Sequence, residues 1–231
     1  MVSKLISIDE AVDQVRDGSC LMVGGFGGIG APVSLIDMIL NKGVHDLTLI
    51  GNDAGFANRG VGRLIFHQRV KRLLTTHIGS NPNAGRQMME GKLDVVFYPQ
   101  GILAEKIRAG GVGLPAILVE PGVGIVPTHQ EQLVSYAGKR YVIEPALTAD
   151  VGIVYAKQAD PYGNLIYEKA ARNLNPLVAM ASKITIAEVE EILPLGELDP
   201  EHIVTPGIFV NYIVRTGGGM GEWGFKSISE T

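Results

Sequence analysis

The stretch Asp17-Gly-Ser-Cys-Leu-Met-Val-Gly-Gly-Phe-Gly-Gly-Ile-Gly-Ala-Pro32 joins a short apolar segment to five closely spaced glycines and a proline. Residues 19–23 form a short, largely apolar run, which predicts a buried β-strand. Pro32 suits the first turn of a helix, where its missing N–H costs nothing. Between them, the glycines permit positive φ and close approach of a ligand, and the helix N-terminus offers unpaired N–H groups. The stretch predicts a main-chain anion site formed by Gly24, Gly25, Phe26, Gly27, Gly28, Ile29 and Gly30.

Spacing alone leaves two other interpretations of this stretch open. It also fits a tight turn between a strand and a helix, although such a turn needs only one or two glycines. Residues 25–30 match the G-x-G-x-x-G fingerprint of dinucleotide-binding domains, and Asp53 lies near the end of the next predicted strand. A dinucleotide- or sugar-phosphate-binding domain is therefore a second hypothesis for the whole chain.

Regular alternation of helices and strands surrounds the stretch. Ser7 and Glu10 have the spacing of a capping box, which predicts a helix from Ile8 to Arg16. Helical spacing of apolar residues follows Pro32 and stops near Gly43. We then expect strands at 47–50, 70–76 and 93–98, and helices at 60–67, 83–90 and 103–109. This alternation, with strands that are apolar throughout, predicts an α/β fold with an open, mostly parallel central sheet and helices on both faces.

The second half of the chain has a different pattern. Residues 110–127 are rich in glycine and proline, which predicts a long functional loop. The runs 133–136 and 140–143 flank Ala137-Gly-Lys139 and predict a hairpin, so we expect antiparallel strands at one edge of the sheet. Further strands are expected at 151–156, 165–167, 184–189 and 208–214, with a helix from about 176 to 182.

The domain organisation follows from the same pattern. Residues 1–216 show no convincing linker, and we expect them to form a single domain. We expect residues 217–231 to be a tail that is flexible or docks on a partner through Trp223 and Phe225.

Ligands of parallel sheets bind beyond the carboxyl ends of the strands. If the strands end where predicted, a glycine or a polar residue follows the carboxyl end of each of four successive strands: Gly24, Asn52, His77 and Gln100. We expect these residues to line one edge of the sheet.

Composition excludes several classes of protein. The chain has 231 residues, a formal net charge of −4 and no basic run, which disfavours a nucleic-acid partner. Residues 18–36 carry no charge, but their glycines and Pro32 argue against a membrane helix. The amino terminus lacks the apolar core of a secretion signal, so we expect a cytoplasmic protein. Cys20 is the only cysteine, which excludes an internal disulfide, and we expect it to be a small core residue.

Catalytic motifs are scarce. The chain has no G-x-S-x-G, Walker lysine, H-E-x-x-H or paired cysteine motif, and its five histidines lack metal-ligand spacing, so we expect no metal site. His77 is better suited to hydrogen bonding at a strand end than to base catalysis. By residue type alone four glutamates are possible nucleophiles, and their neighbours single out none of them: Glu105, Glu120, Glu144 and Glu168.

The string D-G-x-x-(three apolar)-G-G-F-x-x-x-G-x-P at residues 17–32 resembles the signature of the family I coenzyme A transferases, in their alpha subunit or amino-terminal half. The similarity covers nearly the whole chain, through residues 52–55, 99–101, 104–111, 171–176 and 203–207, and ends near Thr216.

This resemblance implies a partner and a set of substrates. In the family the nucleophilic glutamate belongs to the beta subunit, so the chain is expected to work as an alpha subunit in an α2β2 complex. Acyl-CoA, CoA and a short carboxylic acid are the implied substrates, with no permanently bound cofactor. The pair Asn52-Asp53 favours the acetate, butyrate and acetoacetate branch and weakens a 3-oxoadipate function.

The resemblance also implies roles for single residues. Gln100 matches the position that stabilises the oxyanion, and residues 24–30 match the segment described as CoA-binding. We take Asn52, Asp53 and Glu105 as candidates for the substrate pocket. A valine in place of Gly28 or Gly30 is expected to impair CoA-dependent activity more than folding.

Overall fold

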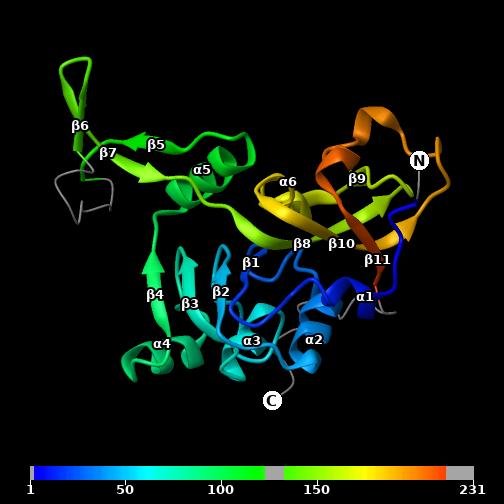
Figure 1. The fold of residues 1–231 in the computed structure, drawn as a ribbon, viewed down its shortest axis with the longest axis horizontal. Coiled ribbons are helices and arrows are strands. Elements are labelled where there is room, and N and C mark those ends of the chain that lie inside the picture. Colours follow the sequence, from blue (N-terminus) through cyan, green and yellow to red (C-terminus); the bar gives the residue numbers. More distant parts are fainter. Residues whose placement is uncertain (1–2, 123–132, 217–231) are drawn as a thin grey trace, which may run out of the picture.

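The computed structural model describes residues 3–122 and 133–216 (Figure 1). Its helices and strands in chain order are α1 (Ile8–Val12), β1 (Cys20–Val23), α2 (Val33–Lys42), β2 (Leu47–Ile50), α3 (Val61–Phe66), β3 (Val70–Thr75), α4 (Pro82–Met89), β4 (Asp94–Phe97), α5 (Gln100–Gly111), β5 (Ala116–Val119), β6 (Leu133–Tyr136), β7 (Lys139–Pro145), β8 (Ala149–Ala159), β9 (Leu165–Ile166), α6 (Asn175–Met180), β10 (Ser182–Ile192) and β11 (Tyr212–Arg215). Within the described residues, three 3₁₀ turns lie between the later elements: η2 (Lys169–Arg172), η3 (Pro200–His202) and η4 (Gly207–Phe209).

A parallel sheet forms the centre of the molecule. Its strands lie in the order β11-β10-β8-β1-β2-β3-β4, and the short strand β9 pairs antiparallel with the end of β8. From β1 the chain builds outward through β2, β3 and β4, and it later returns to place β8, β10 and β11 on the other side of β1 (Figure 1). The strand order therefore reverses between β1 and β8, and such a switch point is where α/β sheets bind their ligands.

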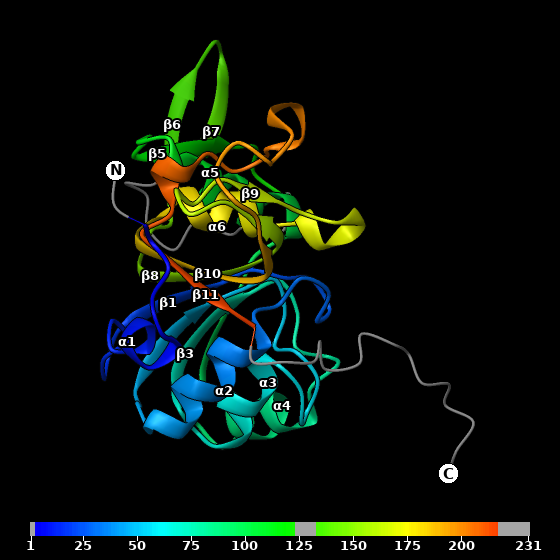
Figure 2. The same cartoon turned by 90° about the vertical axis from the view of Figure 1, so that its right-hand side faces the viewer.

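Helices cover both faces of this sheet, as the alternating pattern predicted. Helices α1 to α4 lie on one face, and α5 and α6 lie on the other (Figure 2). Each face has its own apolar core. One contains Leu35, Ile36 and Ile39 of α2, and the other contains Leu103 and Ile107 of α5. Burial on both faces explains why the strands are apolar throughout.

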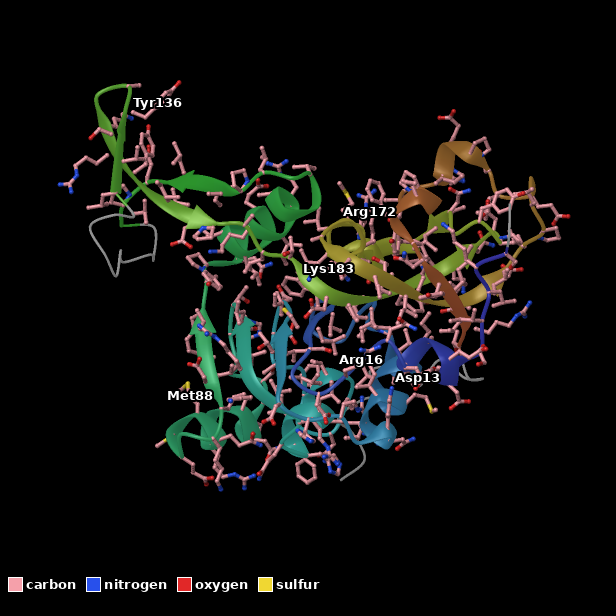
Figure 3. All side chains as sticks on the ribbon, in the orientation of Figure 1. Asp13, Arg16, Met88, Tyr136, Arg172 and Lys183 are labelled. Carbon is pink, nitrogen blue, oxygen red and sulfur yellow. The ribbon has the colours of Figure 1, made fainter. Side chains whose placement is uncertain are left out.

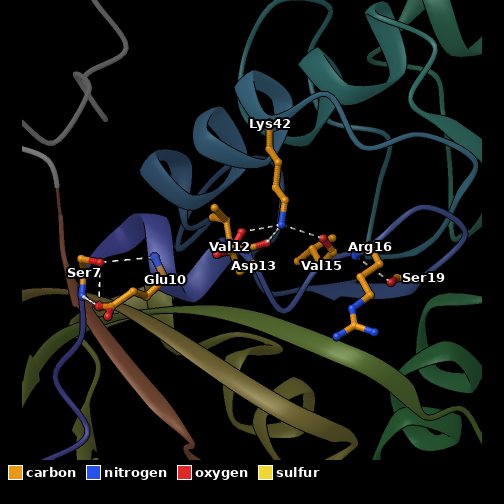
Figure 4. Close-up of polar contacts among 8 residues, drawn as sticks. All are labelled: Ser7, Glu10, Val12, Asp13, Val15, Arg16, Ser19 and Lys42. Atoms are coloured by element: carbon orange, nitrogen blue, oxygen red, sulfur yellow. Dashed lines mark hydrogen bonds and ion pairs between the residues drawn. The ribbon is translucent and has the colours of Figure 1, made fainter.

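The capping box is confirmed at α1. The Ser7 hydroxyl accepts a hydrogen bond from the N–H of Glu10, and the Glu10 carboxylate accepts one from the N–H of Ser7 (Figure 4). Helix α2 ends at Gly43, whose φ of 83° is the left-handed conformation that glycine favours. Lys42, in the last turn of α2, donates to the carbonyl oxygens of Val12 and Val15 and so joins α2 to the segment after α1 (Figure 4).

Three expectations for the second half were wrong. The expected loop at 110–127 was wrong for residues 116–119, which form strand β5 and pair with β7, and its residues 123–127 lie outside the described residues. The antiparallel strands β5, β7 and β6 form a separate three-stranded sheet and do not lie at one edge of the central sheet. The final strand begins at Tyr212, because Gly207–Phe209 form a 3₁₀ turn. The β6–β7 hairpin itself is confirmed, and it extends away from the central sheet with Tyr136 near its tip (Figure 3).

The described residues contain no helix that is long and apolar enough to cross a membrane. The tail at 217–231, with Trp223 and Phe225, lies outside the described residues, and its role stays a prediction.

Candidate active site

Loops that follow β1, β2, β3 and β4 meet at one edge of the sheet. These four strands are parallel neighbours, so Gly24, Asn52, His77 and Gln100 follow their carboxyl ends in spatial order. An isolated parallel bridge between Asp53 and His77 continues the pairing of β2 and β3 beyond the strands. The edge predicted from the strand boundaries is therefore present in the fold.

The loop after β1, which we call the glycine loop (residues 24–30), is held by internal hydrogen bonds. Phe26 and Ile29 exchange two N–H···O bonds of 3.0 Å each, which closes the loop on itself. The N–H of Gly25 donates to Asn173 Oδ1 at 3.2 Å, and the N–H of Gly27 donates to Asp53 Oδ2 at 2.7 Å. Many of the main-chain N–H groups of the loop are thus already paired with acceptors of the same chain.

Crowding separates the glycines of this loop into two groups. A Cβ on Gly24 would lie 1.8 Å from Asn175 Oδ1, and one on Gly30 would lie 2.5 Å from the carbonyl oxygen of Ala171. Gly27 has open space at this position, and Gly28 meets only the ring of Phe56 at 3.9 Å. The expectation for Gly30→Val was therefore wrong, because a side chain there disturbs packing against Ala171 before it meets any ligand.

The N-terminus of α2 is already occupied by an anion. Glu188 of β10 is buried, and its carboxylate accepts the N–H of Leu35 at 3.0 Å. Ser34 also donates to this carboxylate through its N–H and its hydroxyl. Burial raises the pKa of Glu188, and these hydrogen bonds oppose that shift. The sequence predicted a ligand anion here, whereas the carboxylate bound at this helix start belongs to the protein itself.

This arrangement disfavours the dinucleotide hypothesis. A dinucleotide's pyrophosphate binds at the N-terminus of the helix that follows the glycine fingerprint. Here the carboxylate of Glu188 fills that position, and the two charges would repel. The match to G-x-G-x-x-G at residues 25–30 therefore reflects the turn conformation and not a dinucleotide site.

Asp53 joins the glycine loop to the next loop of the edge. Its carboxylate accepts three hydrogen bonds, from the N–H of Gly27 and the side-chain amide of Asn52 at 2.7 Å each and from the N–H of Gly55 at 2.8 Å. The bond to Asp53 fixes which side of the Asn52 amide is the donor. The opposite atom, Asn52 Oδ1, is buried and has no hydrogen-bond partner among the described residues. Asn52 and Asp53 thus lie together beside the glycine loop, both buried, and their assignment to a substrate pocket stays a prediction.

A second loop (residues 55–60) repeats the sequence pattern and the closing bridge of the glycine loop, and sequence reasoning missed it. Its backbone differs, because Ala57 and Asn58 lack the positive φ of Gly27 and Gly28. Both loops have the pattern G-F-x-x-x-G, thirty positions apart, and both close with a bridge from phenylalanine to the residue three positions later. Phe26 is 46% exposed and Phe56 is 45% exposed, so each loop carries an exposed aromatic side chain. The repeat itself was the signal that could have identified this loop.

Gln100 is the first residue of α5 and directly follows Pro99, the N-cap. Its side chain is exposed and makes no hydrogen bond with any described residue. The Gln100 amide therefore has no partner within the described part of the chain, and its role as an oxyanion donor stays a prediction.

The four candidate glutamates are all paired with cations. Glu105 on α5 is exposed and pairs with Arg108 at 2.8 Å. Glu144 is buried against Lys106, and Glu120 lies 3.9 Å from Lys139. Glu168 contacts Lys157 and Lys169. None of the four is an unpaired carboxylate, and this includes Glu105, the substrate-pocket candidate.

The contacts and burial of the candidate metal ligands, among them His77 and Cys20, give little support to histidine or cysteine chemistry. No group of three or more metal-ligating side chains occurs within residues 3–122 and 133–216. His77 is exposed and its Nδ1 lies 3.1 Å from the hydroxyl of Thr76, which fits a hydrogen-bonding role. Cys20 is only partly buried, so the expectation of a core residue was too strong, and burial raises the pKa of its thiol.

The fold is that of an open-sheet α/β protein, and the candidate site lies at its topological switch point. A family model described as Coenzyme A transferase matches residues 5–216. The chain is 56% identical to the alpha chain of a probable coenzyme A transferase of Bacillus subtilis (strain 168), over 96% of this chain and 98% of that protein. It is 46% identical to the alpha chain of the acetate CoA-transferase of Escherichia coli (strain K12), over 93% of this chain and 97% of that protein.

Solved structures agree with these relatives. The acyl-CoA transferase apoenzyme of Escherichia coli O157:H7 superposes with a TM-score of 0.83 at 25% identity, over 93% of this chain and 47% of that chain. The present chain thus spans about half the length of that enzyme. The chain belongs to the coenzyme A transferase family, which confirms the resemblance seen at residues 17–32.

Proposed function

We propose that the chain is the alpha subunit of a heteromeric enzyme that moves CoA between a short-chain acyl-CoA and a carboxylic acid such as acetate, butyrate or acetoacetate. One observation carries the need for a partner. Each of the four candidate glutamates is paired with a cation, whereas the donor Gln100 is unpaired at the carboxyl edge. This subunit supplies binding and oxyanion groups, and a beta subunit supplies the nucleophile. An α2β2 complex in the cytoplasm is the assembly that we propose.

The proposed reaction has two half-reactions. The partner's glutamate attacks the acyl-CoA carbonyl and releases CoA thiolate, which leaves an acyl-glutamyl anhydride. The thiolate then attacks the glutamyl carbonyl, forms a glutamyl-CoA thioester and releases the first carboxylate. A second carboxylate reverses these steps and leaves as the new acyl-CoA. Each attack puts negative charge on a carbonyl oxygen, and the side-chain amide of Gln100 is the donor that we propose for it.

The purified chain without a partner is expected to show no measurable CoA transfer, because the residue that forms the covalent intermediate comes from the other subunit. The measurement is CoA exchange between acetyl-CoA and acetoacetate, with the chain alone and after addition of the beta subunit. Turnover by the isolated chain at the rate of the complex would contradict the split active site.

The preferred acid is tested on the reconstituted complex with acetyl-, butyryl-, acetoacetyl- and succinyl-CoA. Succinyl-CoA is included because one chain of a probable succinyl-CoA:3-ketoacid coenzyme A transferase of Bacillus subtilis (strain 168) is also 46% identical. We expect kcat/KM to be highest for acetyl-, butyryl- or acetoacetyl-CoA. A clear preference for succinyl-CoA would contradict this assignment and would favour a succinyl-CoA:3-ketoacid CoA transferase function.

Replacement of Gly28 by alanine is expected to raise the KM for acyl-CoA about tenfold or more, which corresponds to about 1.4 kcal/mol. The added methyl group would lie on the open side of the glycine loop, where we place the ligand. Gly43→Ala is the matched control, because Gly28 has φ of 87° and Gly43 has φ of 83°, and a Cβ fits at both positions. Backbone strain is therefore similar in the two variants. If Gly28→Ala and Gly43→Ala give the same KM, the glycine loop is only a turn.

A further inference from the structure

The side-chain carboxylate of Glu188, on β10, lies at the N-terminus of α2 although the two elements are far apart in the sequence. Glu188 and Leu35 are 153 positions apart, yet the N–H of Leu35 donates to Glu188 Oε2 at 3.0 Å, and Ser34 donates twice to the same carboxylate. Pro32, at the N-cap position, has no side-chain group that could satisfy these donors. Glu188 is only 4% exposed, so water does not compete for them. The carboxylate therefore replaces both the usual cap and any external anion.

The same carboxylate limits how the glycine loop can move. The loop leads into α2 through Ala31 and Pro32, so a fixed helix start fixes the carboxyl-terminal end of the loop. The loop also donates two hydrogen bonds to side chains, from the N–H of Gly25 to Asn173 and from the N–H of Gly27 to Asp53. After these bonds and the Phe26–Ile29 pair are formed, Gly28 and Gly30 are the loop residues whose N–H groups have no acceptor among the described residues. The loop is thus held at both ends and in the middle, with its open side at Gly27 and Gly28.

We propose that Glu188 is a positioning residue of the active site: its buried carboxylate takes the place of a ligand phosphate at the N-terminus of α2 and holds the glycine loop in one conformation. Substrate then binds a preformed loop and does not bind at the helix itself. The structural part of this proposal stands on the contacts alone, and its kinetic consequence rests on the proposed function.

The test compares three variants of the full chain. Glu188→Gln keeps the shape and one acceptor oxygen, Glu188→Ala removes the acceptor, and Glu191→Ala removes an exposed carboxylate from the same strand as a control. Hydrogen–deuterium exchange of peptides covering residues 24–35 reports the loop without any need for activity. Kinetics with acetyl-CoA are then measured on each variant assembled with the beta subunit.

We expect Glu188→Ala to speed exchange in residues 24–35 selectively and to raise the KM for acetyl-CoA about tenfold or more, since hydrogen bonds to a charged group are lost. Glu188→Gln should stay within about threefold of the wild type, and Glu191→Ala should match it. Added formate should slow the exchange of Glu188→Ala, because a small carboxylate can fill the vacated position, and it should not affect the wild type.

Three results would overturn the proposal. The first is uniform faster exchange over the whole chain in Glu188→Ala with an unchanged KM, which is the signature of a merely structural residue. The second is equal damage by Glu188→Gln and Glu188→Ala. The third is unchanged exchange in residues 24–35. If the wild-type complex transfers no CoA but exchange responds as expected, the proposed function fails and the positioning role of Glu188 stands.

Discussion

Replacement of Gln100 by alanine is expected to lower the kcat of the reconstituted complex about a hundred- to thousand-fold, with no fall in melting temperature. Loss of one oxyanion donor typically costs about 2.7–4 kcal/mol of transition-state stabilisation. The Gln100 side chain is exposed and makes no hydrogen bond with the described residues, so its loss removes no contact that stabilises the fold. The effect should therefore appear in kcat, with KM and assembly nearly unchanged.

Two further variants sharpen this experiment. Gln100→Glu keeps the shape of the side chain but replaces the amide donor with a carboxylate, so it should be at least as slow as Gln100→Ala. Glu105→Gln, on the same helix, changes the exposed substrate-pocket candidate that pairs with Arg108, and any effect should appear in KM and not in kcat, which separates a pocket residue from an oxyanion donor. If Gln100→Ala and Gln100→Glu both turn over near the wild-type rate, the assignment of Gln100 is wrong.

Replacement of Lys106 by methionine is expected to lower the free energy of unfolding by about 3–5 kcal/mol, because it leaves a buried carboxylate without its partner. Lys106 Nζ lies 2.5 Å from Glu144 Oε2, and the two side chains are 3% and 10% exposed. The ammonium group also lies 4.5 Å from the centre of the Tyr98 ring. Burial, reinforced by the charge of Glu144, raises the pKa of the Tyr98 hydroxyl. The pair joins α5 to β7 and so joins the small sheet to the body of the molecule.

Urea unfolding of the full chain measures this effect, and melting temperature should fall by about 2–4 °C per kcal/mol for a chain of this size. Arg72→Met is the matched control, because the Arg72–Asp94 pair at 3.2 Å is 53% and 62% exposed and should contribute at most about 1 kcal/mol. The double variant Lys106→Met/Glu144→Leu should recover most of the lost stability, since it removes both charges. A single variant no more damaging than Arg72→Met would show that the buried pair contributes little.

Local sequence signals determined much of this fold. The capping box at Ser7, the stop at Gly43 and the apolar strands followed by helices each depend on residues a few positions apart, so the sequence shows them directly. The carboxyl edge could also be predicted, because parallel neighbouring strands necessarily end on the same side of a sheet. Residues 17–32 even indicated the family, which the comparisons confirm.

Only the tertiary structure decided which groups meet at the site. Glu188 reaches Leu35 across 153 positions, and Lys106 reaches Glu144 across 38, through packing of elements that no local pattern encodes. The same holds for the glycines, because whether Gly30 tolerates a side chain depends on the carbonyl of Ala171. Strand β5 was missed because the glycine and proline residues around it predicted a loop. Its pairing with β7, which is distant in the sequence, stabilises the strand. Short-range hydrogen bonding and periodicity can be read from sequence, whereas contacts set by strand order and helix packing exist only once the chain has folded.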